Sequence, residues 1–413
     1  MNRFLYYCGI RLYVWGIRLA AFFGQTKAQK WGQGRLQWQQ KLQILLANNQ
    51  APILWMHCAS LGEFEQGRPV LEALRQQAPK HRLLLTFFSP SGYEAQQNCP
   101  QADWVFYLPA DLYGQAQQFL DLVQPQQAFF VKYEFWAGYL QELKKRQIPT
   151  HLIAANFRPN QVFFRWYGSL FRQLLYCFEN IFVQTTASKE LLAPLGHPKV
   201  IVAGDTRLDR VLAIKAQDRQ LSNIAQFCAQ APTLVAGSTW SPDERLLEGW
   251  LRAHPKKQLL LVPHEIQEEH LQEILERFSF VKIARYSHLL NNHSFPKPQV
   301  LLMDQIGLLS ALYGYGTAAY IGGGFGAGIH NCLEAVVYEI PLFFGPNYHK
   351  FQEAKALIAA GIATEIQNAN DLARGLNKYT PIEERTVLQE KAKAYLEAQK
   401  GATAIILQHL VFS

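Results

Sequence analysis

The sequence predicts an α/β protein with two domains, each built on a parallel sheet. The chain has 413 residues, enough for two or three domains at roughly 150 residues each. From residue 51 onward, short apolar runs alternate with helical stretches, which is typical of parallel sheets. A polar stretch at 217–222 interrupts this alternation once. We therefore expect Rossmann-like domains at 42–210 and 211–413, preceded by a separate segment at 1–41.

The composition excludes two broad classes of protein. Hydrophobic residues make up 49% of the chain and charged residues 17%, so the chain can bury sizeable cores and is not disordered overall. The formal net charge of +8 lies almost entirely in residues 1–50, which carry seven Lys or Arg and no Asp or Glu. A general nucleic-acid surface is therefore not expected. The six cysteines form no C-x-x-C pair, which favours a reducing compartment over a zinc or disulfide framework.

The basic N-terminal segment begins with an aromatic helix. Residues 4–23 are rich in aromatic and aliphatic side chains, but Arg11 and Arg18 interrupt the run, which disfavours a spanning helix and a cleaved signal peptide. On a helix, Arg3, Arg11 and Arg18 fall within about 80° of one another and face away from a broad aromatic surface. This pattern is typical of a helix that lies in a membrane interface. The alternative is an amphipathic helix that only packs on its own domain.

The strand and helix candidates alternate along both domains. Strands are expected at 53–57, 83–88, 104–108, 128–132, 151–155, 181–184 and 200–203, and then at 234–236, 258–262, 281–284, 300–303, 319–321 and 342–344. Helices are expected at 65–77, 116–123, 136–146 and 163–178, and then at 243–253, 267–277, 306–313, 331–338 and 351–360. Open parallel sheets bind ligands beyond the carboxyl ends of their strands. Functional residues are therefore expected directly after the strands, in a cleft between the two domains.

Three charged residues meet this condition in the first domain. Glu63 follows the first strand, where Gly62 would supply a sharp turn and the start of a helix would stabilise a charged carboxylate, as suits a general base. Glu134 follows the fourth strand among aromatic residues, and Arg207 follows the seventh, where it can bind a phosphate or carboxylate through two hydrogen bonds. Structural explanations also exist: a helix N-terminal charge, an ion pair in an aromatic cluster, and a linker held by ion pairs.

In the second domain, backbone groups and one histidine meet the same condition. Gly237, Ser238 and Thr239 form a predicted turn whose N–H groups would face an anion, although the sequence lacks the Lys of a P-loop. His264 follows Pro263 at the end of the next strand and can hydrogen-bond a phosphate. A lone histidine at such a place is otherwise a structural residue.

A glycine-rich loop is the strongest local signal. The stretch 322–334 contains five glycines between a strand and a predicted helix, and it fits the dinucleotide-binding fingerprint only loosely. Asn331 and Glu334 would share one face of that helix, from which the carboxylate can hold ribose hydroxyls. The structural alternative is a tight junction with a helix cap. No D-x-D, H-E-x-x-H or G-x-S-x-G motif occurs, so no metal site is expected.

Taken in order, these motifs resemble the 3-deoxy-D-manno-octulosonic acid (Kdo) transferases of lipopolysaccharide assembly. The matching stretches are 55–63 (WMHCASLGE), 107–111 (YLPAD), 132–136 (KYEFW), 204–210 (GDTRLDR), 322–334 (GGGFGAGIHNCLE) and 344–347 (FGPN). The resemblance implies a GT-B glycosyltransferase that uses CMP-Kdo and the lipid A precursor (lipid IVA), without a cofactor. It also implies a location at the cytoplasmic face of the inner membrane, against anionic lipids, and no nucleic-acid partner.

The resemblance further implies roles for individual residues. Glu63 matches the proposed catalytic base of the family, and Glu134 and Arg207 match positions associated with the site and the transition state. Gly237, Ser238 and Thr239 would add backbone donors. The CMP-binding positions would map to Pro263, His264, Ile306, Gly307, Leu308, Asn331, Cys332, Leu333 and Glu334.

Three other functions are compatible with parts of the pattern. Another GT-B enzyme with a different nucleotide sugar would share the two domains and the strand-end residues. A nicotinamide-dependent oxidoreductase would rest on the loose glycine fingerprint alone. A non-catalytic membrane-docked protein would rest on residues 1–41.

Overall fold

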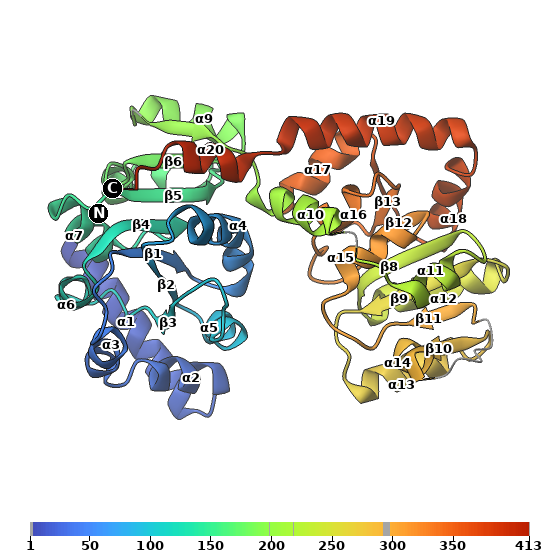
Figure 1. The fold of residues 1–413 in the computed structure, drawn as a ribbon, viewed down its shortest axis with the longest axis horizontal. Helices are drawn as coiled ribbons and strands as arrows, with labels where there is room; N and C mark the ends of the chain where they lie inside the picture. Colours follow the sequence, from blue (N-terminus) through green and yellow to red (C-terminus); the bar gives the residue numbers. More distant parts are fainter. Residues whose placement is uncertain (1–2, 198, 218, 292–297, 413) are drawn as a thin grey trace. The chain divides into compact units, whose positions relative to one another are not determined.

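The structure is a computed structural model that describes residues 3–197, 199–217, 219–291 and 298–412. The chain divides into two units, Met1–Asp209 with Lys400–Ser413, and Arg210–Gln399. Within the described residues each unit has one parallel sheet of seven strands (Figure 1). This confirms the predicted α/β class with two parallel-sheet domains.

The sheet of the first unit has the order β3-β2-β1-β4-β5-β6-β7. Its strands are β1 (Ile53–Cys58), β2 (Arg82–Phe87), β3 (Trp104–Tyr107), β4 (Pro125–Val131), β5 (Thr150–Ala155), β6 (Asn180–Val183) and β7 (Val200–Val202). The helices of this unit are α1 (Arg3–Phe22), α2 (Thr26–Gly34), α3 (Trp38–Leu46), α4 (Leu61–Gln77), α5 (Pro90–Gln96), α6 (Gln115–Val123), α7 (Ala137–Lys145), α8 (Ser169–Leu175), α9 (Thr186–Leu192) and α20 (Ala402–Gln408), with 3₁₀ turns η1 (Val162–Phe164) and η2 (Ala193–Leu195).

Helices cover both faces of this sheet, so the central strands are mostly apolar, and β1 and β5 are buried along their whole length. In β1, Trp55 packs on Phe119 of α6 and Tyr139 of α7, with ring centroids 5.0 and 5.8 Å apart. Its neighbour Met56 belongs to the core on the opposite face, which includes Phe64 of α4. Burial on both faces explains why the strands could be found as continuous apolar runs.

The predicted segment 1–41 is part of the first unit and not a separate one. Tyr6, Val14, Trp31 and Trp38 are buried against it. The opposite side of α1 exposes most of the helix's large hydrophobic residues: Phe4, Leu5, Leu12, Tyr13, Trp15, Leu19 and Phe22. Among the described residues, no helix is long and apolar enough to span a membrane.

The C-terminal segment corrects the predicted domain boundary. Residues 400–413 were assigned to the second domain, but they return to the first unit. Ile406 and Leu407 of α20 fill the core beside α4. Asp209 holds the start of this segment by accepting hydrogen bonds from the backbone N–H groups of Gly401 (2.7 Å) and Thr403 (2.6 Å).

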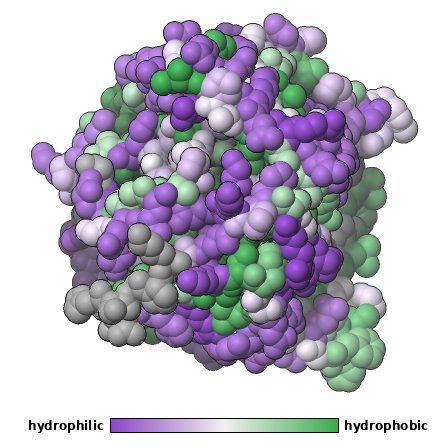
Figure 2. All heavy atoms as spheres, turned by 90° about the vertical axis from the view of Figure 1, so that its right-hand side faces the viewer, coloured by the Kyte–Doolittle hydropathy of each residue, from purple (hydrophilic) through white to green (hydrophobic). Residues whose placement is uncertain are grey.

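The sheet of the second unit has the order β10-β11-β9-β8-β12-β13-β14. Its strands are β8 (Thr233–Thr239), β9 (Gln258–Pro263), β10 (Ile283–Arg285), β11 (Val300–Leu302), β12 (Ala318–Ile321), β13 (Leu342–Phe344) and β14 (Ala363–Glu365). The helices are α11 (Ser222–Cys228), α12 (Ser241–Ala253), α13 (Glu268–Arg277), α14 (Tyr286–Asn291), α15 (Leu309–Leu312), α16 (Leu333–Val336), α17 (Gln352–Ala359), α18 (Ala369–Lys378) and α19 (Ile382–Gln399), with the 3₁₀ turn η3 (Tyr313–Tyr315), and α10 (Thr206–Ala216) crosses the boundary between the units. The surface in Figure 2 is mostly hydrophilic.

Several predicted elements are shorter than expected. The helix predicted at 163–178 is reduced to η1 and α8, which are separated by a tight turn where only glycine fits at position 168, since a side chain there would collide with the backbone carbonyl of Val162. The helix predicted at 331–338 is only the four residues of α16. The strand β14, with three residues at the sheet edge, was not predicted.

The packing of α20 predicts a stability effect. Replacing the fully buried Ile406 by Ala leaves a cavity under α4, so Ile406→Ala should lower the free energy of unfolding by about 2–4 kcal/mol. Ile44→Ala, at a 77% exposed position of the same unit, is the control and should change it by less than about 0.5 kcal/mol. Denaturant unfolding measures both. Equal effects would show that α20 is not part of the core.

Candidate active site

The first unit changes strand order at β1. From β1 the sheet runs through β2 to β3 on one side, while β4 lies on its other side. In open parallel sheets, such a switch point is where ligands bind, beyond the carboxyl ends of the strands. Glu63 follows β1 and Glu134 follows β4, so the two predicted carboxylates come from the two strands that flank this point.

Glu63 lies in the first turn of α4 and not after a glycine turn. Ser60 is the N-cap in an extended conformation, the helix begins at Leu61, and Gly62 is already helical. This corrects the predicted sharp turn at Gly62. The Oε2 atom of Glu63 accepts a hydrogen bond of 2.6 Å from the backbone N–H of Ala59, which directs the part-buried carboxyl back to the end of β1.

The pKa of Glu63 is raised to about 8. Burial is the largest cause and the negative charge of Glu134 is the next, while the N–H groups of Ala59 and Ser60 and the charge of Lys132 act in the opposite direction. The sequence predicted a carboxylate stabilised in its charged form by the helix start. That expectation was wrong, because desolvation and a second carboxylate outweigh the backbone donors.

Glu134 is buried, and its Oε2 atom contacts two side-chain nitrogens. It accepts a hydrogen bond of 2.6 Å from Trp136 Nε1 and lies 3.1 Å from His57 Nε2. These contacts hold the Glu134 carboxyl in place, from where its negative charge contributes to the raised pKa of Glu63.

Buried contacts from β2 hold the ring of His57. Thr86 Oγ1 accepts the indole N–H of Trp55 at 2.8 Å and lies 2.9 Å from His57 Nδ1, which is also 3.1 Å from the carbonyl oxygen of Thr86. These contacts orient the imidazole so that Nε2 faces Glu134. His57 and Trp136 were not predicted as site residues, although both lie inside the stretches 55–63 and 132–136.

Arg207 lies at the start of α10, beside the helix that carries Glu63. The hydroxyl of its neighbour Thr206 donates a hydrogen bond of 2.5 Å to the carbonyl of Gln66 in α4. The guanidinium pairs with Asp205, with 2.5 Å between Nη2 and Oδ2. The structure thus brings Glu63 and Glu134 together, and it shows Arg207 in the ion pair that the structural explanation anticipated.

The second unit has its switch point at β8, which lies between β9 and β12. The predicted turn Gly237–Thr239 is instead the end of β8, with a bulge and a left-handed Ser238 (φ 53°). The glycine loop follows β12 and packs tightly on this bulge. A side chain at Gly322 would approach the carbonyl oxygen of Ser238 to 2.2 Å, so glycine is required there.

Three rings gather at this edge. His264 stacks on His330 with centroids 4.3 Å apart, and Trp240 lies 4.7 Å from His264. Trp240 Nε1 donates to His330 Nε2 at 3.0 Å. Burial and the neighbouring His264 lower the pKa of His330 to about 4, so His330 is neutral at pH 7 and carries its hydrogen on Nδ1. Trp240 and His330 were not among the predicted site residues.

The remaining predicted residues differ in what they can offer a ligand. Asn331 Nδ2 donates to Glu334 Oε1 at 3.1 Å, so these two side chains are paired as expected, although Asn331 precedes the short α16. Cys332 and Leu333 are buried in the core and can meet a ligand only through their backbone.

Beyond β11, Ile306 is 85% exposed and Leu308 is buried. Gly307, which lies between them in the sequence, has a positive φ of 84°. The last predicted residue, Pro263, is at the end of β9.

In the described ranges, no group of three or more His, Cys, Asp or Glu side chains could hold a metal ion.

Comparison with known proteins agrees with this arrangement. A family model described as 3-deoxy-D-manno-octulosonic-acid transferase (kdotransferase) matches residues 36–210. The 3-deoxy-D-manno-octulosonic acid transferase of Aquifex aeolicus is 27% identical over 356 residues, which cover 83% of this chain and 92% of the relative. The enzyme of the same name from Haemophilus influenzae is 28% identical over 317 residues, covering 73% and 72%.

The fold has distant structural relatives. The UDP-GlcNAc 2-epimerase from Neisseria meningitidis superposes with a TM-score of 0.58 at 14% identity, covering 86% of this chain and 98% of that one, which shows the shared two-domain fold. The sequence matches make the chain similar to Kdo transferases over most of its length, and they support a glycosyltransferase.

The raised pKa of Glu63 predicts a pH-dependent stability effect. In the unfolded chain the carboxyl ionises near 4.5, whereas in the folded protein it keeps its proton up to about 8. The stability from the neutral carboxyl is therefore fully present below pH 4.5 and is lost as the pH rises through about 8. Glu63→Gln is neutral throughout, so it should stabilise the protein by about 1–3 kcal/mol at about pH 9 and by much less at about pH 5.

Thermal unfolding of both proteins at the two pH values measures this difference. Glu190→Gln, at an exposed position of α9, is the matched control and should show no pH-dependent gain. The same gain at both pH values for Glu63→Gln would mean that the carboxyl is not held in its neutral form.

Proposed function

We propose that the protein transfers Kdo from CMP-Kdo to the lipid A precursor (lipid IVA), with Glu63 as the general base. The observation that carries the proposal is the pair of carboxyl groups at the β1–β4 switch point, in which burial and the neighbouring Glu134 raise the pKa of Glu63 to about 8. The two relatives described above carry the name of this activity, and they cover most of the chain.

The proposed reaction uses the pair as follows. An acceptor sugar hydroxyl gives its proton to the carboxylate of Glu63, while its oxygen attacks the anomeric carbon of Kdo. The bond from that carbon to the phosphate oxygen breaks, and CMP leaves as a phosphate monoester anion. A base works best when its pKa lies near the working pH, and the charge of Glu134 keeps Glu63 in that range.

The donor groups belong to the second unit in this proposal. The loop after β12 runs very close to the ends of β8 and β13. A side chain at Gly322 would lie 2.2 Å from the carbonyl oxygen of Ser238, and one at Gly324 would lie 2.5 Å from the backbone nitrogen of Gly345. Such a loop lets a phosphate approach backbone N–H groups. The Asn331–Glu334 pair and His264 lie at the same edge and would hold the nucleotide, and Arg207 would stabilise charge on the leaving phosphate.

We also propose that α1 lies on the cytoplasmic face of the inner membrane. Its exposed hydrophobic residues include Phe4 at 71%, Trp15 at 62% and Phe22 at 84% exposure. In the second unit, the large exposed hydrophobic residues among those described are only Leu290, Ile306, Ile382 and Val387. An aromatic helix with Arg3, Arg11 and Arg18 suits an anionic lipid surface, where an acidic lipid acceptor is found.

Mass spectrometry of the lipid A precursor incubated with CMP-Kdo and enzyme tests the function. Glu63→Gln should lower kcat at least about 100-fold without loss of folding, because the base is removed, while the exposed Glu190→Gln should leave kcat unchanged.

In the wild type, kcat/KM should rise with pH through about 8, as the base loses its proton. Glu134→Gln should move this rise to lower pH, because the neighbouring charge is gone.

Two results would reject parts of this proposal. If no mass increase corresponding to Kdo occurs with the wild type, the reaction is not Kdo transfer to this acceptor. If Glu63→Gln keeps near-normal turnover, Glu63 is not the base.

A further inference from the structure

A cavity of about 320 Å³ lies directly beside Glu134 in the first unit. Apart from Glu134 at its edge, the lining is mainly apolar and includes Ile10, Phe135, Val162, Phe163 and Phe171. It draws on α1, the loop after β4, η1 and α8. The cavity thus joins the N-terminal helix to the residue that controls the proton on Glu63.

Contacts made by the lining residues themselves fix the walls of this cavity. The Tyr6 hydroxyl donates a hydrogen bond of 2.7 Å to buried Asp111 and accepts one of 3.1 Å from the backbone N–H of Ala137. These bonds hold α1 against the start of α7. On the other side, the rings of Phe135 and Phe163 pack edge to face with centroids 4.7 Å apart. The space is therefore preformed.

We infer that this cavity binds one acyl chain of the acceptor lipid. The inference rests on the proposed function. It assigns a binding place to the acyl chain, which is the part of the acceptor that lies away from the reacting hydroxyl. A chain held here places its headgroup next to Glu134 and Glu63. With about 320 Å³, the cavity is at the small end of ligand pockets, which span about 300–1,000 Å³, so it suits one chain and not several.

Positive charge near the cavity suits an acidic headgroup. Tyr133 lines the cavity and lies within the electrostatic influence of the exposed Arg158 and of Glu63. The guanidinium of Arg3 lies 5.7 Å from the ring of Tyr7, which is next to the lining residue Tyr6. These two cations lie near the cavity and not in its lining, so they would meet the headgroup of an anionic lipid and not its chain.

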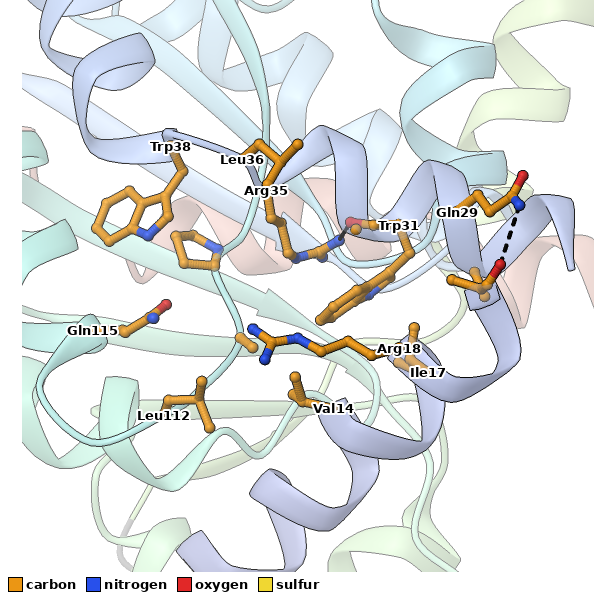
Figure 3. A pocket seen from close by; sticks show the side chains of 15 residues that line it. Val14, Ile17, Arg18, Gln29, Trp31, Arg35, Leu36, Trp38, Leu112 and Gln115 are labelled. Carbon is orange, nitrogen blue, oxygen red and sulfur yellow. Dashed lines mark hydrogen bonds between the residues drawn. The ribbon is translucent and has the colours of Figure 1, made fainter. Parts of the chain in front are cut away.

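A second cavity of about 300 Å³ provides the comparison. It lies between α1, α2 and the loop before α6, and Arg18 extends across it next to Trp31 (Figure 3). Arg35 at its edge is already bound, since it donates to the carbonyls of Phe88 (2.7 Å) and Leu108 (2.8 Å). Neither Glu63 nor Glu134 lines this cavity, so a chain bound there would not deliver a hydroxyl to the carboxylate pair.

Photolabelling tests the site without relying on Kdo transfer. The probe is dodecyl phosphate with a diazirine in its chain, below its critical micelle concentration. We expect labels in residues 133–136 and 161–171. Val162→Trp, which fills the cavity, should reduce them at least about fivefold, whereas Ile44→Trp, at an exposed position, should not. Labels confined to 14–38 and 109–115, or labelling that Val162→Trp does not change, would overturn the assignment.

Kinetics with two acceptors provide a second readout. Kdo transfer is compared between the acylated precursor and its deacylated form. Val162→Trp should lower kcat/KM for the acylated acceptor about tenfold, mainly through KM, and leave the deacylated one within about twofold. Ile10→Trp, from the opposite wall, should do the same if Val162→Trp fails to fold. Equal losses for both acceptors would overturn the assignment.

The failure of the function and the failure of this site are distinguishable. A wild type that transfers Kdo to neither acceptor contradicts the proposed function, whereas the photolabelling still decides whether the cavity binds an anionic single-chain lipid.

Discussion

The burial of Glu63 beside a second carboxyl group, at the ends of β1 and β4, is the constraint on which the chemistry of this protein depends. Removal from water disfavours the charged form of a carboxyl group, and a second negative charge nearby adds to this effect. Burial and the charge of Glu134 together raise the pKa of Glu63 to about 8, so Glu63 carries a proton below that pH. A carboxyl group that would otherwise be a weak base at neutral pH thereby becomes a suitable one.

The fold supplies this constraint through three neighbouring strands. The strands β1 and β4 pair directly, although β2 and β3 lie between them in the sequence. From the other side, β2 contributes Thr86, which orients His57. Helices on both faces of the sheet exclude water from these strands, so His57 and Thr86 contact each other in a fully buried setting.

Much of the fold could be predicted from the sequence, because strands buried on both faces form continuous apolar runs. The edge strand β14 could not, since its three residues, Ala363, Thr364 and Glu365, form no apolar run. The return of residues 400–413 to the first unit depends on Asp209, which contacts Gly401 and Thr403 far along the chain. The positions of Glu63 and Glu134 followed from the strand-end rule. The direction of the Glu63 pKa shift did not, because it depends first on the burial of the carboxyl group and then on Glu134, which only the sheet brings close.

The most direct test is the titration of the Glu63 side chain by NMR, using the ¹³C signal of its carboxyl carbon assigned through Glu63→Gln. The carboxyl should titrate with a midpoint of about 8 in the wild type, and the midpoint should fall by about one unit or more in Glu134→Gln. A midpoint near 4.5 in both proteins would contradict the account, because Glu134 would then exert no control over the proton on Glu63.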